Sequence, residues 1–550
     1  MTDRSDEPRD DAAAEGSEAR VAPVGVAAEP TAPATEGDGE SAPSTPKAET
    51  EGTDREGEGS DEPDPANVGD PTPSPGESDA PAAAKPARES GPVAAPSRVH
   101  LIRGGILFAI GFLGSFVLMA LETAPGRGAL YGIPLALLST AGLLDMLGLL
   151  SASLLPPKEL EATTSWRSTW IAPIGREPMF LAPVIAIPLA ITITVLAALL
   201  GSWDQLPYGI LAALAALAPA AARRPGLLVF VVASGIILPF LGVYGLWDPW
   251  ETHYGEVARE ILARDDWISL WWAHEEWFFS KPILIFWTEA LSMSAFGFDP
   301  LPHANNLHPE WAVRFPEYVL STVALMCIYA MVSRSHGKRA GAIAALVVVT
   351  LPHFFLLSHQ AITDMPFVST MTMAMCMLGI AVSADEGAEA PRYRLGPIVV
   401  SGQTLTLGTI TTVALPQAIY LFTRNVTLVE GGFAWHGDRF MFGSAGNAGN
   451  PGHPAAREVT PVFDGLFSQP GMQALYWVIG LGLVVWMLRR ERRVRHLAMF
   501  GFYFFCGLSF MAKGIPGFAL PGMVALLYLI ASRRWELLLG GQLRVAAGIL

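Results

Sequence analysis

Long apolar segments alternate with short polar connections from about residue 104 to the end of this chain. Many of them approach the roughly 20 residues that a helix needs to cross a bilayer. Inside lipid, only a helix satisfies the backbone polar groups of an apolar run of this kind. The pattern predicts an all-α polytopic membrane protein with about 12 or more transmembrane helices. The expected spans lie near residues 104–122, 129–150, 180–200, 206–222, 227–246, 314–333, 340–358, 365–382, 396–421, 472–488, 497–511 and 514–531.

Basic residues in the connections orient these spans. They cluster at positions 223–224, 334–339, 392–394, 489–496 and 533–534. The positive-inside rule places such clusters in the cytoplasm. If the N-terminus is also cytoplasmic, five crossings bring the chain to the outer side at Trp247.

The segment 282–298 is apolar, but it is short and carries Glu289. If it crossed the membrane, most of the later basic clusters would lie outside, against the positive-inside rule. We therefore expect a juxtamembrane helix on the outer surface, within an outer loop 247–313. The same count places Asp364, Lys513 and a second loop, 422–471, on the outer side.

Residues 1–97 differ in composition from the rest of the chain. They contain 23 acidic and 7 basic residues, whereas the whole chain carries a net charge of −15. Such a segment buries too little apolar surface to offset the entropy lost on ordering, so we expect a disordered cytoplasmic tail. A solvated bristle and a regulatory or partner-binding tail both fit this composition. No basic start and apolar core of a secretory signal is present in it.

At the other end, residues 536–550 close on the apolar run LRVAAGIL, which we expect to begin a further span. The three cysteines (Cys327, Cys376 and Cys506) lie inside apolar runs and are expected to be packing residues. No cluster of residues has metal-ligand spacing, so no metal is expected.

The outer loop opens with WDPWETHYGEVAREI, residues 247–261. Asp248 suits an N-cap, Pro249 the first helical position and Glu251 the third, which together predict a capped helix start. The apolar positions that follow fall on one helical face, which predicts an amphipathic helix at the membrane surface. These positions are Tyr254, Val257, Ala258, Ile261 and Leu262.

Three further features of the outer side suggest chemistry. Seven of the 15 tryptophans lie between Trp247 and Trp287, as an interfacial belt or as surfaces on which sugars or prenyl groups stack. Lys281 precedes the apolar segment, where it either snorkels or holds a lipid phosphate. Asp364 lies at the outer end of a span and is either a functional acid or a helix cap.

In order along the chain, these motifs resemble the GT-C type lipid-linked-sugar glycosyltransferases, in the branch of protein O-mannosyltransferases and aminoarabinose transferases (the family 39 and 83 type). The resemblance covers about residues 225–535, which implies that residues 98–224 are accessory transmembrane helices. The matching stretches are Pro249–Tyr254 followed by Gly255–Glu260, Lys281–Leu284, Arg314, Thr363–Pro366 and Lys513-Gly514. Trp250 departs from the pattern, since the family has an aspartate there, and His253 replaces an arginine.

The resemblance implies transfer of a sugar from a polyprenyl-phosphate donor by single displacement. An acid acts as base toward the acceptor, and cations neutralise the departing phosphate. The acceptor is a lipid, a glycan or a protein, and the expected location is a bacterial inner membrane with the active site extracytoplasmic. The implied roles are Asp248 or Glu251 as base, Asp364 as a second catalytic acid, Lys281, Arg314 and Lys513 at the phosphate, and His253 and Tyr254 lining the pocket.

Two other classes of protein remain open from the sequence. A transporter would carry ionisable groups deep in the membrane, whereas here only Asp145 looks deep and the other charges lie at span ends. A catalytically inactive protein that binds a lipid-linked sugar would be consistent with Trp250 in place of the aspartate.

Overall fold

The computed structural model describes residues 95–120, 127–155, 206–268, 280–300, 308–429 and 469–534, with a few residues more between 160 and 192, within 270–278 and at 432–435. Nearly all of the acidic N-terminal segment lies outside these residues. The predicted span 180–200 (apart from Thr192), most of the loop 422–471 and residues 535–550 lie outside them as well.

The described part of the chain is mainly helical, as predicted. Six of its helices are long and apolar enough to cross a membrane: α1 (Arg98–Ala120), α10 (Pro309–His336), α13 (Asp364–Ser383), α14 (Gly402–Thr423), α15 (Pro470–Leu488) and α16 (Val494–Lys513). Shorter apolar helices occupy four other predicted spans: α2 (Arg127–Met146), α6 (Leu206–Ala221), α7 (Pro225–Ile237) and α17 (Pro516–Ser532). The protein is therefore an integral membrane protein.

Prolines interrupt two of the predicted spans. The span 340–358 divides into α11 (Lys338–Val349) and α12 (Pro352–Leu357), and α7 gives way to a 3₁₀ turn, Leu238–Phe240. Proline has no amide hydrogen and clashes with the preceding turn, so it weakens a helix at the point where it occurs.

Short strands occur where the sequence pattern predicted none. Most lie in the connections, but Ile398–Ser401 lies at the start of the predicted span 396–421, which becomes helical from Gly402. A three-stranded sheet joins β1 (Thr164–Ser165), β4 (Arg392–Leu395) and β5 (Ile398–Ser401) in the order β1-β4-β5. The pair β4–β5 is an antiparallel hairpin in which Arg392 lies opposite Ser401, and Gly396 adopts a φ of 61° at its turn. Two small hairpins join β2 (Trp271–Trp272) with β3 (Glu276–Trp277) and β6 (Val426–Val429) with β7 (Gly432–Trp435).

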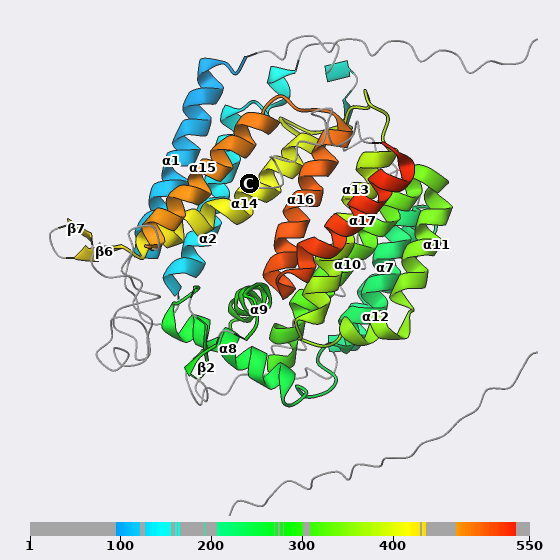
Figure 1. Cartoon of the computed structure of the whole chain (residues 1–550), viewed down its shortest axis with the longest axis horizontal. Helices are drawn as coiled ribbons and strands as arrows, with labels where there is room; N and C mark the ends of the chain where they lie inside the picture. Colours follow the sequence, from blue (N-terminus) through cyan, green and yellow to red (C-terminus); the bar gives the residue numbers. More distant parts are fainter. Residues whose placement is uncertain are drawn as a thin grey trace, which may run out of the picture. The chain divides into compact units, whose positions relative to one another are not determined.

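The helices pack closely where small residues meet. α1 lies along α2, and a Cβ atom built on Gly142 would come within 2.4 Å of the Phe108 backbone nitrogen. Glycine thus allows two backbones to approach, which is the usual way for transmembrane helices to gain contact area. α1 and α2 also pack on α14, while α13 packs between α10 and α16 (Figure 1).

Two helices of the predicted outer loop lie at one end of this bundle, α8 (Trp250–Arg264) and α9 (Leu284–Ala295) (Figure 1). With 12 residues, α9 is about 18 Å long, against roughly 30 Å for the hydrocarbon core. Glu251 at the start of α8 is ion-paired with Arg314 near the start of α10. The outer loop 247–313 therefore begins and ends at the same end of the bundle, so α9 does not cross the bundle.

The basic clusters lie at the end of the bundle opposite to α8. α10 and α13 begin beside α8 and end at residues 336 and 383, whereas α16 runs back from residue 494 to Lys513. At the far end Arg534 donates to the Val382 carbonyl, and the Ala390 amide donates to the Arg492 carbonyl. This separation agrees with the predicted topology; which end faces the cytoplasm stays a prediction.

Candidate functional site

The helix predicted at the start of the outer loop is present, but its predicted cap is wrong. α8 begins at Trp250, and no side chain caps it. The Asp248 carboxylate accepts a hydrogen bond from the Thr252 hydroxyl at 2.9 Å, not from a backbone amide. Glu251 accepts from the backbone amide of Trp247 at 2.7 Å, so it points back across the turn. Tertiary partners of Glu251 override the local capping preference.

The apolar face predicted for α8 is confirmed. Its members are all at most 4% exposed: Tyr254, Val257, Ala258, Ile261 and Leu262. They belong to a core cluster with Phe286 and Met293 of α9 and Val313 of α10. The face therefore packs on protein and fixes α8 against α9 and the start of α10.

Glu251 and Arg314 form a fully buried ion pair at the centre of this packing. Arg314 Nε and Nη2 donate to Glu251 Oε1 and Oε2 at 2.8 and 2.7 Å, and neither side chain is exposed. Each carboxylate oxygen accepts a second bond, Oε1 from the Ala361 amide at 2.8 Å and Oε2 from the Trp247 amide. The pair thus joins α8, α10 and the loop before α13.

Arg314 also binds the turn that follows α7. Its guanidinium donates to the carbonyls of Leu241, Tyr244 and Gly245 at 2.7–2.8 Å and lies 4.0 Å from the centre of the Tyr244 ring. Arginine suits such a site because its planar group presents five donors in a fixed geometry. With these partners, Glu251 and Arg314 have an evident structural role. Their predicted roles as base and phosphate ligand stay predictions.

Asp364 and Lys513, which are 149 residues apart in sequence, form an ion pair. Asp364 is the first residue of α13 and Lys513 the last of α16. Their side chains are 40% and 41% exposed, so both charges remain accessible to a ligand. The Lys513 ammonium also lies 5.8 Å from the centre of the Phe367 ring. Two residues predicted to share a pocket are thus in direct contact.

Tyr254 lies near Asp364, and His253 precedes it on the first turns of α8. Burial, together with the negative charges of Asp364 and Glu289, raises the pKa of Tyr254 to about 12. The phenol therefore remains a neutral hydrogen-bond donor at neutral pH. The His253 ring stacks on Trp272, with 3.7 Å between ring centres. One of the clustered tryptophans therefore forms an aromatic surface beside α8. Trp247 and Trp250 are more than half exposed, as expected of an interfacial belt.

Two buried acids beside the site received no role from the sequence. Glu289 of α9 and Glu317 of α10 are 0% exposed, and neither side-chain oxygen of either residue has a hydrogen-bond partner in the described part of the chain. Burial, and the nearby carboxylates of Glu317 and Glu251, raise the pKa of Glu289 well above its usual value. Both residues interrupt apolar runs, and that was the signal available in the sequence.

The remaining candidates lie less centrally. Lys281 is half-buried in the turn before α9, and no hydrogen bond or ion pair within the described residues joins it to the other candidates. Asp248 is exposed at the mouth of α8. Asp145, the acid that looked deep, is paired with Arg103 at 2.7 Å near the opposite end of the bundle. In the described part, no group of three or more His, Cys, Asp or Glu side chains is placed to hold a metal ion.

Acids, cations and aromatic groups thus gather at one end of the membrane bundle, and comparisons with known proteins indicate which proteins the chain resembles. Residues 280–435 match the family model described as dolichyl-phosphate-mannose-protein mannosyltransferase. Over this part of its length the chain is similar to glycosyltransferases that use a lipid-linked sugar donor, and the curated relatives carry names of the same class.

Two relatives carry the name undecaprenyl phosphate-alpha-4-amino-4-deoxy-L-arabinose arabinosyl transferase. The protein from Edwardsiella ictaluri is 28% identical over 175 residues, which are 32% of this chain and 29% of the relative. The second such transferase of Sodalis glossinidius is 30% identical over 166 residues, 30% of this chain and 28% of the relative. This chain thus spans less than a third of the length of these relatives. The crystal structure of ArnT from Cupriavidus metallidurans bound to undecaprenyl phosphate overlaps 58% of this chain and 38% of its own, at 16% identity and a TM-score of 0.34.

Proposed function

We propose that this protein transfers a sugar from a polyprenyl-phosphate donor to a lipid, glycan or protein acceptor, at the extracytoplasmic face of a bacterial inner membrane. The family match at residues 280–435 and the names of the curated relatives support the donor class. The separation of the basic clusters from the α8 end of the bundle supports the orientation.

One observation carries the proposal: ionisable groups far apart in the sequence meet at one end of the bundle. The Glu251–Arg314 pair ties α8 to α10, and the Asp364–Lys513 pair ties α13 to α16. The backbone amide of Ala361 donates to Glu251 and lies three residues before Asp364, so this short segment connects the two pairs. A reaction at a lipid phosphate needs an acid and a cation within reach of the membrane surface, and this arrangement supplies both.

The geometry favours different tasks for the two pairs. Lys513 is accessible, so its ammonium is placed to neutralise the phosphate that leaves the anomeric carbon. A phosphate that binds Lys513 would compete with Asp364, and the released carboxylate would then be available to the acceptor or the sugar. Of the two proposed bases, Asp248 is exposed, whereas both oxygens of Glu251 already accept two bonds each. We therefore place Asp248 as base and Glu251 as a positioning residue.

Further residues complete the proposed pocket. Tyr254 and His253 form one wall, with Trp272 as an aromatic surface on which a sugar or prenyl group stacks. Lys281, at the start of α9, is a second phosphate ligand. The transferase domain comprises residues 225–535, with α1 and α2 as accessory helices that pack on α14.

The test is deletion of the gene followed by mass spectrometry of envelope glycolipids and glycoproteins. Loss of one sugar modification, restored by the wild-type gene, identifies the product. Complementation with Asp364→Asn and Lys513→Gln should then fail. The control is Asp385→Asn, which removes an exposed acid at the opposite end of α13 and should restore the product. If both site variants restore it fully, the proposed site is wrong.

A further inference from the structure

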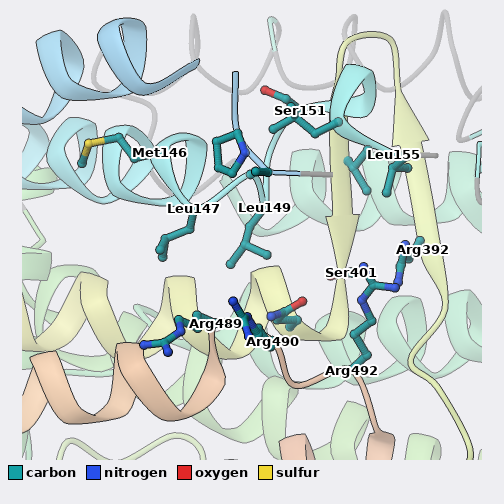
Figure 2. Close-up of a pocket in the computed structure, with 16 residues that line it drawn as sticks. Met146, Leu147, Leu149, Ser151, Leu155, Arg392, Ser401, Arg489, Arg490 and Arg492 are labelled. Carbon is teal, nitrogen blue, oxygen red and sulfur yellow. The ribbon is translucent and has the colours of Figure 1, made fainter. Parts of the chain in front are cut away.

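A cavity lies at the end of the bundle opposite to the Asp364–Lys513 cluster, near the ends of α2 and α15. Its volume is about 290 Å³. Figure 2 shows arginines of the α15–α16 turn on one side of it and Met146, Leu147 and Leu149 across from them. The polar lining residues are Ser151, Arg392, Ser401, Gln403, Arg489, Arg490 and Arg492.

Positive charge dominates this cavity. Four arginines and no acid line it. Of the nearby acids, Glu389 pairs with the lining Arg392 at 3.8 Å, whereas Asp145 is engaged with Arg103 and Ser151, and Glu491 with Arg493 and His496. Burial alone would raise the pKa of Glu491, but the hydrogen bonds from His496 and Arg493 outweigh it and hold the pKa below its usual value. Guanidinium groups close to one another repel, and a bound anion offsets that repulsion.

Backbone contacts hold the cavity walls in place. The Ala152 amide donates to the Pro397 carbonyl at 2.9 Å, and the Val399 amide donates to the Leu150 carbonyl at 2.9 Å, so the apolar wall is fixed to β5. On the arginine side, the Gln403 side-chain amide donates to the Leu488 carbonyl at 2.7 Å, directly before Arg489. The positive-inside rule explains why arginines lie at this end. The rule does not explain why three separate segments enclose a cavity that these arginines line.

The surroundings indicate what kind of anion fits. Leu147, Leu149 and Leu155 make one wall apolar, and Trp486, one turn before the arginines, is 57% exposed on α15. An exposed tryptophan at a helix end is typical of the membrane interface, where lipid headgroups lie. The volume is near the lower limit of about 300 Å³ for ligand pockets, which is enough for a headgroup but not for a whole lipid.

We propose that this cavity binds the phosphodiester headgroup of an anionic glycerophospholipid, with the arginines on the phosphate and the glycerol and first acyl carbons along the leucine wall. Arginine binds phosphate through paired hydrogen bonds, and basic pockets between transmembrane helices take anionic headgroups in this way. The site is separate from the Asp364–Lys513 cluster, so its failure and the failure of the proposed function are distinguishable.

The experiment is native mass spectrometry of the full-length protein, delipidated in detergent and titrated with phosphatidylglycerol or with phosphatidylcholine of the same acyl chains. Wild type should prefer phosphatidylglycerol by about tenfold or more. Arg489→Gln with Arg490→Gln should weaken its binding about 10- to 30-fold, given the contribution of each basic residue near an anionic surface. The matched control, Arg334→Gln with Arg339→Gln, removes the same charge at the same end outside the cavity and should change binding by less than about twofold.

A third part of the experiment tests whether the cavity binds a lipid or only a free anion. Inorganic phosphate at millimolar concentration should displace little phosphatidylglycerol, because it makes no contact with the leucine wall. The double variant Arg489→Lys with Arg490→Lys keeps the charge and controls for misfolding of the glutamine variant. It should bind phosphatidylglycerol more weakly than wild type and more tightly than the glutamine variant. Equal retention of both lipids, equal losses in the cavity and control variants, or full displacement by phosphate would each overturn the proposal.

Discussion

Glu251 and Arg314 are completely buried and bind each other through two parallel hydrogen bonds, at 2.8 and 2.7 Å. The carboxylate also holds the amides of Trp247 and Ala361, while the guanidinium holds three carbonyls of the turn after α7. This pair positions α8 and the loop before Asp364, so the geometry of the proposed site depends on it.

Breaking the pair should destabilise the protein. Glu251→Ala leaves the Arg314 charge buried without its partner, and removing one member of a buried pair costs about 3–5 kcal/mol. Thermal unfolding in detergent should show a clearly lowered midpoint for this variant and for Arg314→Met. The control Glu256→Ala removes an acid from the same helix whose pair with Arg259 is partly exposed, and it should change the midpoint little. An unchanged midpoint in the first two variants would contradict the role we give the pair.

The Asp364–Lys513 pair should behave in the opposite way. Both side chains are about two-fifths exposed, and exposed pairs contribute about 0–1 kcal/mol to stability. Asp364→Asn and Lys513→Gln should therefore leave the unfolding midpoint nearly unchanged and reduce sugar transfer about 10²- to 10³-fold. The reversed pair, Asp364→Lys with Lys513→Asp, should regain the ion pair but no activity. Recovery of activity in the reversed pair would show that the residues serve only to hold the helices together.

Asp248 should affect turnover more than binding. If it is the base, Asp248→Asn should lower kcat about 10²- to 10⁴-fold with little change in KM. Thr252→Ala is the control, because it removes the hydroxyl that Asp248 accepts from and keeps the carboxylate. A loss confined to KM, or full activity in Asp248→Asn, would move the base to Asp364.

Stability should depend on pH through Glu289. Its pKa is raised in the folded protein, so the folded state holds the proton more tightly than the unfolded state, where the pKa is about 4.3. The stability it contributes is complete below that value and is lost as the pH rises toward the folded pKa. Glu289→Gln mimics the protonated form and should lose less stability than wild type between about pH 5.5 and pH 8.5. If the unfolding midpoints of wild type and Glu289→Gln change equally over this interval, the pH dependence does not come from Glu289.

Labelling should establish the sidedness on which the proposed function depends. Trp250 is 53% exposed at the mouth of α8, and Arg490 is exposed at the other end of the bundle. Each position is replaced by cysteine in a chain whose three native cysteines are serine. A membrane-impermeant maleimide added to intact cells should label Trp250→Cys and not Arg490→Cys. Labelling in the reverse order would place the site in the cytoplasm and end the proposal of extracytoplasmic transfer.

Hydrophobic patterning was sufficient for much of the architecture. Every predicted span that falls within the described residues contains a helix, in two cases interrupted by proline, although the span 396–421 begins with strand β5. The amphipathic face of α8 and the contact of Asp364 with Lys513 agree with expectations based on periodicity and on counting crossings. Where the prediction of the α8 cap failed, Asp248 and Glu251 had the right spacing but found other partners.

What the sequence by itself determined is therefore the set of elements and the ends of the bundle at which their polar groups emerge, because burial in lipid acts on each segment separately. Which polar groups meet was decided only by the tertiary structure. Glu251 reaches Arg314 and Ala361, 63 and 110 residues away, and Gln403 reaches Leu488, 85 residues away. Such pairings depend on how helices pack side by side, and no local pattern of residues encodes that.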